Sequence, residues 1–167
     1  MDEIHLIEAI KIAFAQVGPG EITLHEAEAI DSYAGMEERN QARRLDNEAS
    51  WWEVPDEAIE ACPNALPHLD PAGWRFYIAA YMTWALRHFR HSSSIITDYT
   101  IYSFDFHPDG DLVKYKLARF TSLSEQQIQV VCSFLRFMAQ NGDLADERVA
   151  ADALNNYWGR LCESPSV

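Results

Sequence analysis

The chain has 167 residues, 48% of them apolar and 12% aromatic, and a formal net charge of −13 at pH 7. Domains of roughly 100–200 residues are common, so we expect one globular domain over 1–167; the apolar content excludes an intrinsically disordered chain. The negative field repels DNA, RNA and anionic membranes, so no nucleic-acid or membrane partner is expected; it favours a basic protein partner, or serves solubility alone.

Two amphipathic helices are predicted at the N-terminal end. Apolar side chains recur every three to four positions over 4–17, up to a Gly-Pro-Gly stop. Thr23 and Glu26 have the spacing of a capping box, which predicts a second helix that ends near Gly35. Residues 36–50 are almost wholly polar and have no period, so a solvated helix and a loop both stay open.

An aromatic and proline-rich stretch follows. Trp51 and Trp52 are adjacent, so their side chains point in different directions, and we expect one in the core and the other partly exposed. A short helix is predicted over 55–61. Pro63 and Pro67 are incompatible with a helix interior, so this part of the chain is expected to be an irregular crossing.

The longest apolar segment of the chain also has its clearest helix start. Asp70 supplies an N-cap oxygen, and Pro71 suits the first helical position because its missing N–H would have no partner there. A helical projection of 71–90 places apolar side chains over more than half of the circumference and arginines in a narrow stripe. Such a wide apolar face predicts a central helix around which the others pack.

A small β-hairpin is predicted at about 99–119. Thr100, Tyr102 and Phe104 fall on one side of an alternating pattern, and β-branched and aromatic residues favour strands. A turn over 107–111 leads into a second alternating run. A single hairpin is marginally stable alone, so it is expected to lie against the helices.

Two more helices are predicted towards the C-terminus. Ser124 and Gln127 form a capping box at the start of the first, and the second covers about 145–161. Residues 163–167 are expected to fray. The predicted fold is therefore mainly α, with five or six helices around a central helix at about 71–90 and one small hairpin.

The three cysteines, Cys62, Cys132 and Cys162, cannot all pair within one chain, and none belongs to a CxxC motif. Cys132 and Cys162 lie in helical patterns, where free cysteines behave as small hydrophobes, so a reducing compartment is expected. The acidic N-terminus lacks the basic and apolar regions of a signal peptide, and the apolar runs are too short to span a membrane. These features together predict a cytoplasmic protein.

No metal, cofactor or catalytic residue is assigned from the sequence. His88 and His91 are three residues apart, with His107 and Asp109 in a nearby turn, but this set is incomplete for zinc and no HExxH motif is present. Cys62 is interpreted as a structural thiol, because its acidic surroundings would raise a thiol pKa and disfavour a nucleophile.

Two groups of side chains are candidates for binding. The first group contains aromatic and acidic residues of one short stretch: Trp51, Trp52, Glu53, Asp56, Glu57 and Glu60. It is interpreted either as a docking patch for a basic partner or as a solvated face. The second is the arginine stripe of the predicted central helix: Arg75, Arg87 and Arg90. Arginines bind phosphates and carboxylates, but 16 acidic residues lie in 1–70, so ion pairs within the chain are favoured here. Glycine-rich phosphate loops and a GxSxG motif are absent.

The segments WWEVPDEAIEACPNALPHLDPAGWRFYIAAYM and RFTSLSEQQIQVVCSFLRFM together resemble a family of small bacterial proteins known only as a domain of unknown function. The shared pattern is a Trp, a Val-Pro-Asp turn, a Leu-Asp-Pro-aromatic helix start and a Leu-Ser-x-x-Gln helix start. The resemblance covers Trp51 to Met138. It implies no activity or site residue. Many small acidic bacterial families serve as immunity or partner proteins, which is an analogy only.

Three functional hypotheses follow. The first is a non-enzymatic binding protein whose acidic N-terminal half engages a basic protein, as an immunity-type or regulatory partner. The second is a small enzyme with a pocket near the Pro-rich crossing 62–75, around His68, Asp70, Trp74 and Arg75. The third is a structural protein that forms homo-oligomers through an exposed apolar patch.

Overall fold

A computed structural model describes residues 2–142 and 144–162, and helices account for most of this part of the chain. The mainly α prediction is confirmed, but there are more helices than the expected five or six. The predicted fraying of 163–167 lies outside the described residues. The helices are α1 Glu3–Ala13, α2 Leu24–Asp31, α3 Met36–Arg43, α4 Asp56–Ala61, α5 Pro71–His88, α6 Ile96–Ser103, α7 Val113–Phe120, α8 Glu125–Asn141, α9 Leu144–Ala153 and α10 Gly159–Cys162. Short 3-10 turns cover η1 Trp51–Glu53 and η2 Leu66–His68, and a π-helical turn covers η3 Leu154–Trp158.

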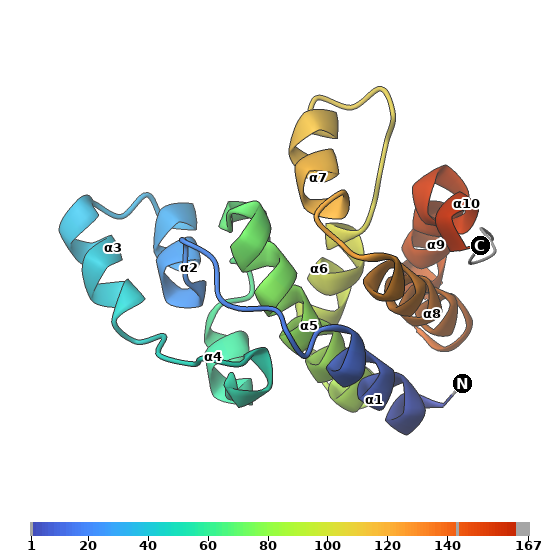
Figure 1. The fold of residues 1–167 in the computed structure, drawn as a ribbon, viewed down its shortest axis with the longest axis horizontal. Coiled ribbons are helices and arrows are strands. Elements are labelled where there is room, and N and C mark those ends of the chain that lie inside the picture. The colour runs from blue at the N-terminus through green and yellow to red at the C-terminus, as the bar shows by residue number, and fades with distance from the viewer. Residues whose placement is uncertain (1, 143, 163–167) are drawn as a thin grey trace.

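Helix α5 lies in the middle of the molecule, as the sequence predicts (Figure 1). Asp70 caps it: one carboxylate oxygen accepts hydrogen bonds from the backbone N–H groups of Ala72 and Gly73. The other oxygen accepts from the N–H of Ile22 at 2.9 Å, so the same side chain also holds the chain that leads into α2. Twelve of the 18 residues of α5 are buried, so other elements cover most of the surface of this helix.

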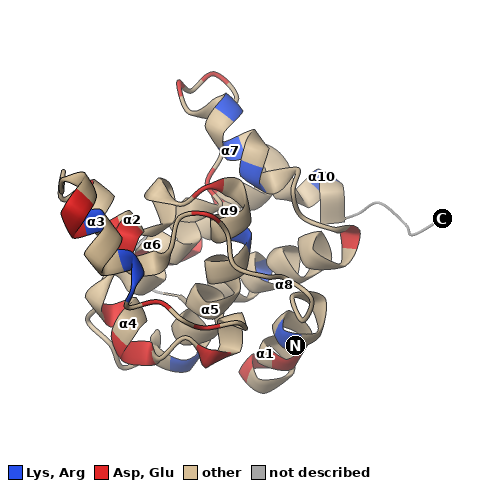
Figure 2. Ribbon diagram, turned by 60° about the vertical axis from the view of Figure 1, so that its left-hand side comes forward, with Lys and Arg blue, Asp and Glu red and all other residues tan. Residues whose placement is uncertain are grey.

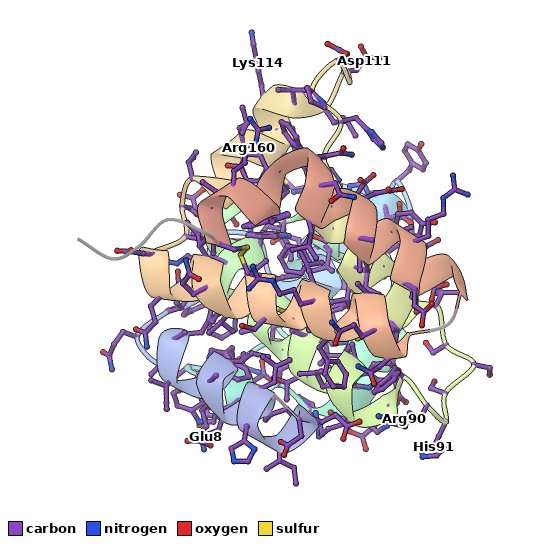
Figure 3. The ribbon with its side chains drawn as sticks, turned by 90° about the vertical axis from the view of Figure 1, so that its right-hand side faces the viewer. Glu8, Arg90, His91, Asp111, Lys114 and Arg160 are labelled. Atoms are coloured by element: carbon purple, nitrogen blue, oxygen red, sulfur yellow. A yellow bond between two sulfur atoms is a disulfide. The ribbon has the colours of Figure 1, made fainter. Side chains whose placement is uncertain are left out.

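Helix α8 begins with the capping box that the sequence predicts. The Ser124 hydroxyl accepts from the Gln127 N–H, and the Gln127 carboxamide accepts from the Ser124 N–H. The helix lies between α1 on one side and α9 on the other (Figure 3). The Gln127 amide also donates to the carbonyl of Ala13 at 3.0 Å, so one side chain binds both the last residue of α1 and the N-cap of α8.

The predicted β-hairpin at 99–119 is wrong, since this stretch contains α6 and α7 and no strand. Ile96, Thr100 and Phe104 are buried four residues apart, which is a helical spacing. The Thr100 hydroxyl donates to the Ile96 carbonyl at 2.7 Å, which satisfies a buried polar group inside the helix. Thr100 and Phe104 belong both to the alternating pattern that predicted a strand and to this helical pattern. Packing of α6 against α5 and α9 favours the helix.

The polar stretch after α2 forms a helix, α3, that packs against α2. Its anchor is Glu26, whose side chain is only 3% exposed. The Glu26 carboxylate accepts from Arg39 at 3.1 Å and from Arg43, whose Nη2 lies 2.7 Å away. The predicted capping box of Thr23 and Glu26 is therefore wrong: Glu26 holds α3, and the buried Thr23 hydroxyl has no hydrogen-bond partner.

Cys132 and Cys162 form a disulfide that ties α10 to α8, so the expectation that both are free is wrong. Their Cα atoms are 6.0 Å apart across a sequence separation of 30 residues. Cys132 is in α8 and Cys162 is in α10, and a separation of 30 residues without a CxxC motif gives no sequence signal for this pairing. The cysteine content therefore no longer supports a reducing compartment. No helix among the described residues is long and apolar enough to cross a membrane.

Breaking this disulfide is expected to lower the free energy of unfolding by about 2–4 kcal/mol, because the cross-link restricts the unfolded chain. Urea unfolding with and without dithiothreitol measures the effect. Cys162→Ser is the matched control, since it removes the bond but leaves the rest of the chain intact. Its midpoint should be low and insensitive to the reductant. Equal midpoints of the oxidised wild type and Cys162→Ser would contradict the expectation.

Candidate functional site

The two adjacent tryptophans have different environments. Trp51 is 2% exposed, and its indole N–H donates to the carbonyl of Phe14 at 3.2 Å. Trp52 is 45% exposed and packs edge-on against Trp51, with ring centroids 5.7 Å apart. The η1 turn thus fixes one ring in the core and uses it to support the other at the surface. Of the two candidates, only Trp52 is available to a partner.

The carboxylates next to Trp52 divide into paired and unpaired groups. Asp56 accepts from Arg87 at 2.6 Å and from His88 at 2.9 Å, and Glu53 accepts from the Ser50 N–H at 2.9 Å. Glu57 and Glu60 are exposed on α4, and their side chains make no hydrogen bond or ion pair within the described residues. We call the group Trp52, Glu53, Asp56, Glu57, Glu60 and Arg87 the Trp52 surface.

The arginine stripe does not act as one site. Arg87 reaches Asp56 on the Trp52 surface, and Arg90 reaches Glu3 of α1 at 2.6 Å. Arg75 instead donates to the Gln127 side chain at 3.0 Å, about 18 Å from Arg87 along the helix axis. Two of the three arginines therefore pair with carboxylates of the N-terminal half, whereas Arg75 takes part in the packing of α5 on α8.

The histidines proposed as weak metal candidates have other surroundings. His88 is bound to Asp56 and packs on Trp84, with ring centroids 4.6 Å apart. His91 is exposed. Within the described residues, no group of three or more His, Cys, Asp or Glu side chains is arranged to hold a metal ion.

A depression of about 280 Å³ adjoins Trp52. Its walls come from α1, η1, α4 and α5, with Lys11 and Arg87 as the charged groups and Val54, Ile59 and Ala80 as the apolar ones. Arg87 is neutralised by Asp56. The depression widens the area around Trp52 in which a side chain of a partner can be buried.

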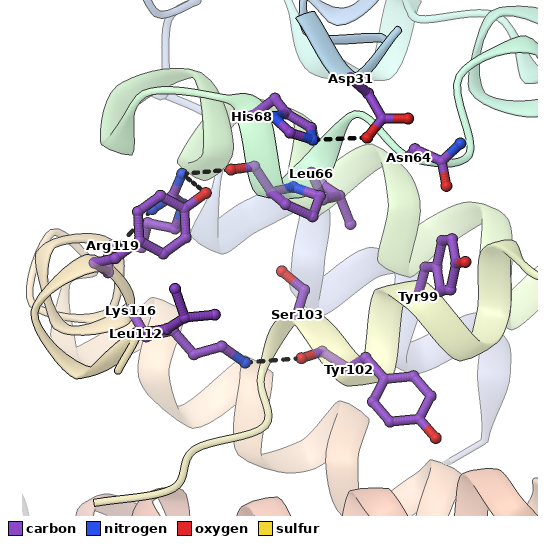
Figure 4. Close-up of a pocket in the computed structure, with 12 residues that line it drawn as sticks. Asp31, Asn64, Leu66, His68, Tyr99, Tyr102, Ser103, Leu112, Lys116 and Arg119 are labelled. Atoms are coloured by element: carbon purple, nitrogen blue, oxygen red, sulfur yellow. Dashed lines mark hydrogen bonds and ion pairs between the residues drawn. The ribbon is translucent and has the colours of Figure 1, made fainter. Parts of the chain in front are cut away.

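A larger cleft of about 480 Å³ lies at the Pro-rich crossing (Figure 4), and we call it the α6–α7 cleft. It is lined by Asp31, Asn64, Leu66, Pro67, His68, Tyr99, Tyr102, Ser103, Leu112, Tyr115, Lys116 and Arg119. Of the residues that the sequence suggested for a pocket here, only His68 lines it. Asp70 caps α5, Trp74 is buried, and the Arg75 side chain of α5 donates to Gln127 of α8. The sequence did not suggest the α6 and α7 residues as part of a pocket, because it predicted a hairpin in that stretch.

Two cations lie on the α7 wall of the cleft. Lys116 donates to the carbonyl of Tyr102 at 3.1 Å and to that of Asp105, and burial lowers the pKa of its ammonium group. Arg119 is 4% exposed and donates to the carbonyls of Pro67, Leu69 and Tyr115 and to the Tyr115 hydroxyl. On the adjoining η2 wall, whose Pro67 carbonyl accepts from Arg119, His68 is hydrogen-bonded to Asp31 at 3.0 Å.

Cys62, at the start of the Pro-rich crossing, is a free and buried thiol. Burial, with a smaller effect of Glu28 and Asp46, raises the pKa of its thiol from 9.0 to about 12. Its carbonyl accepts the hydroxyl of Tyr81, which is also buried. Both observations agree with the structural role that the sequence suggests.

Native protein is therefore expected to be inert towards a thiol reagent such as dithionitrobenzoate at pH 8. In urea without reductant, one thiol per chain should react, since Cys62 is free and the other two cysteines are bonded. The unfolded thiol ionises near 9 and the folded one near 12, so the unfolded state releases its proton first. The stability that Cys62 contributes should be complete below pH 9 and fall as the pH rises towards 12. Rapid labelling of the native protein would contradict this account.

The sequence profile of a family of unknown function, DUF6714, matches residues 2–161. The chain therefore belongs to this family. No curated protein and no solved structure matches the chain.

Proposed function

We propose that this member of the DUF6714 family is a non-enzymatic binding protein, an immunity-type or regulatory partner, that docks a basic protein on the Trp52 surface. The observation that carries the proposal is a large aromatic ring that is both exposed and rigidly supported. Trp52 is 45% exposed, and Trp51 beneath it is fixed by its hydrogen bond to Phe14. Tryptophan is one of the residue types enriched among those that contribute most to binding in protein interfaces.

Charge supports a basic partner. Residues 1–70 carry a net charge of −12, and Asp and Glu positions recur along α4 and the chain that leads to it from α3 (Figure 2). Many of these carboxylates bind partners within the protein, but Glu57 and Glu60 beside Trp52 do not. Free carboxylates around an aromatic anchor accelerate the encounter with a cationic protein, and the ring then loses water at contact.

The two other hypotheses have less support. A hydrolytic enzyme needs a nucleophile within hydrogen-bond reach of a base. In the α6–α7 cleft His68 binds Asp31, and the Ser103 hydroxyl accepts the indole N–H of Trp74 at 2.7 Å. Homo-oligomers would need a continuous apolar patch. The exposed apolar residues are spread over several elements, among them Ile4 and Ile12 of α1 and Leu45 after α3.

Affinity capture at low salt, followed by binding measurements with the purified captured protein, tests the proposal. A basic protein should be retained at about 50 mM salt and released at about 500 mM, since exposed charges are screened. Trp52→Ala should weaken binding at least about 30-fold, which corresponds to the roughly 2 kcal/mol of an anchor residue. Leu45→Ala is the matched control, because Leu45 is 62% exposed but lies outside the Trp52 surface.

The charges are tested separately with Glu57→Gln and Glu60→Gln combined. This variant should slow association and reduce its salt dependence, with a smaller effect on dissociation. Glu37→Gln on α3 is the control, since Glu37 is exposed and unpaired in the described chain. The proposal fails if Trp52→Ala and Leu45→Ala bind the partner equally well.

A further inference from the structure

We propose that the α6–α7 cleft binds a small organic anion, with its acidic group at Lys116 and an aromatic or aliphatic body against Tyr99, Tyr102 and Leu112. The proposed function does not use this cleft, which lies on other elements than the Trp52 surface. The inference rests on the size of the cleft, its exposed apolar lining and the unpaired cations in its wall.

The cleft has the size and lining of a small-molecule site. Its volume of about 480 Å³ falls within the roughly 300–1,000 Å³ of ligand pockets. Tyr99, Tyr102 and Leu112 are all exposed although they are large and partly apolar. Figure 4 shows Tyr99 and Tyr102 of α6 on one side of the cleft and Arg119 of α7 on the other, with Lys116 reaching from α7 to the carbonyl of Tyr102. A ligand in the cleft would cover the apolar surface of these residues and reach the ammonium group of Lys116.

The cations of the α7 wall lack a carboxylate partner. Arg119 is 4% exposed, yet its donors reach only carbonyl groups and a phenol oxygen. Lys116 donates to two carbonyls and has three N–H donors, so one donor remains. The carboxylates whose charges act on these cations have other partners: Asp105, which acts on Lys116, pairs with His107 at 3.0 Å, and Asp70, which acts on Arg119, caps α5. Buried charges are normally paired, so this wall is suited to an anion.

Charges elsewhere in the cleft do not cancel this effect. Asp31 is the acidic residue of the lining, and His68 is hydrogen-bonded to it. Lys116 and Arg119 leave the lining with a net charge of +1, or +2 with His68 protonated, in a chain of net −13. Burial lowers the pKa of Lys116, and a bound anion would act in the opposite direction because a nearby negative charge favours the ammonium form. A cationic ligand would be repelled by Lys116 and Arg119, and the Asp31 carboxylate is already hydrogen-bonded to His68.

Two fluorescent probes of similar shape test this inference. Anilinonaphthalene sulfonate carries an anionic group, and phenylnaphthylamine has the same aromatic body without it. The wild type should bind the sulfonate at least about tenfold more tightly, since a charge-assisted contact is worth more than 1 kcal/mol. Lys116→Met should remove this preference and leave the affinity for phenylnaphthylamine within about twofold. Lys116→Arg keeps the charge and should retain the preference.

Matched variants locate the effect. Lys114→Met removes an exposed cation of α7 that does not line the cleft, and it should change neither affinity. Tyr102→Ala should weaken both probes, and it serves as a second variant if Lys116→Met unfolds the protein. Trp52→Ala should leave both affinities unchanged, which separates this site from the proposed docking surface. The inference is overturned if the wild type shows no preference for the sulfonate, or if Lys114→Met and Lys116→Met have equal effects.

Discussion

Replacing both Arg39 and Arg43 by methionine is expected to lower the free energy of unfolding by about 3–5 kcal/mol. The double variant leaves the Glu26 carboxylate without its two partners at a position where only 3% of the side chain is exposed. An uncompensated buried charge costs far more than the loss of a surface ion pair. Urea unfolding followed by circular dichroism gives the value.

The buried charge, rather than lost packing, should cause this effect. Glu26→Gln in the same double variant removes the charge and should recover most of the stability. Arg44→Met is the control, because the exposed Arg44 side chain is not one of the two arginines that pair with Glu26. If Arg39→Met/Arg43→Met were no less stable than Arg44→Met, the anchor assigned to α3 would be wrong.

Gly20→Ala is expected to destabilise the protein by at least about 3 kcal/mol or to prevent folding. A Cβ atom on Gly20 would overlap the backbone N and Cα of Gly73 and lie 2.7 Å from the Asp70 carboxylate. Neither backbone can move easily, since Asp70 binds the N–H groups of Ile22 and Gly73 at this crossing. The chain before α2 and the start of α5 would have to separate. Thermal unfolding by calorimetry measures the loss.

Gly18→Ala is the matched control two residues earlier. A Cβ atom there meets nothing within 4 Å, so its stability should stay within about 0.5 kcal/mol of the wild type. A Gly20→Ala variant as stable as Gly18→Ala would show that the close approach of the two segments is not required.

The sequence predicts an element well where local chemistry alone determines it. Asp70 and Pro71 define the start of α5, and the Ser124–Gln127 capping box defines that of α8, because these caps bind N–H groups of their own helix. Glu26 shows the limit of this reasoning. Its spacing from Thr23 fits a capping box, but Arg39 and Arg43 come from another helix.

The prediction of a hairpin in the α6 and α7 region was wrong for a related reason. Its β-branched and aromatic residues favour strand locally, and Ile96, Thr100 and Phe104 also fit a helical face. Contact with the rest of the core makes the choice. The buried indole of Trp158 donates to the Phe104 carbonyl at 2.8 Å, a contact across 54 residues that no local pattern reveals.

The candidate sites follow the same division. Trp52, Glu53, Asp56 and Glu57 are close in sequence, so the sequence brings them together as a candidate patch. Which tryptophan is exposed depends on the carbonyl of Phe14, which accepts the Trp51 indole. The α6–α7 cleft joins α2, the Pro-rich crossing, α6 and α7, and the sequence suggested only the crossing 62–75, with His68 as the one named residue that lines the cleft.

The most direct test of the Trp52 surface is acrylamide quenching of tryptophan fluorescence in the complex with the captured basic protein. Trp52 is 45% exposed, whereas the other four tryptophans are at most 2% exposed, so quenching of the free protein reports mainly on Trp52. Trp52→Phe gives the baseline. We expect complex formation to reduce quenching to that baseline. Quenching that is unchanged in the complex would contradict the claim that the partner covers Trp52.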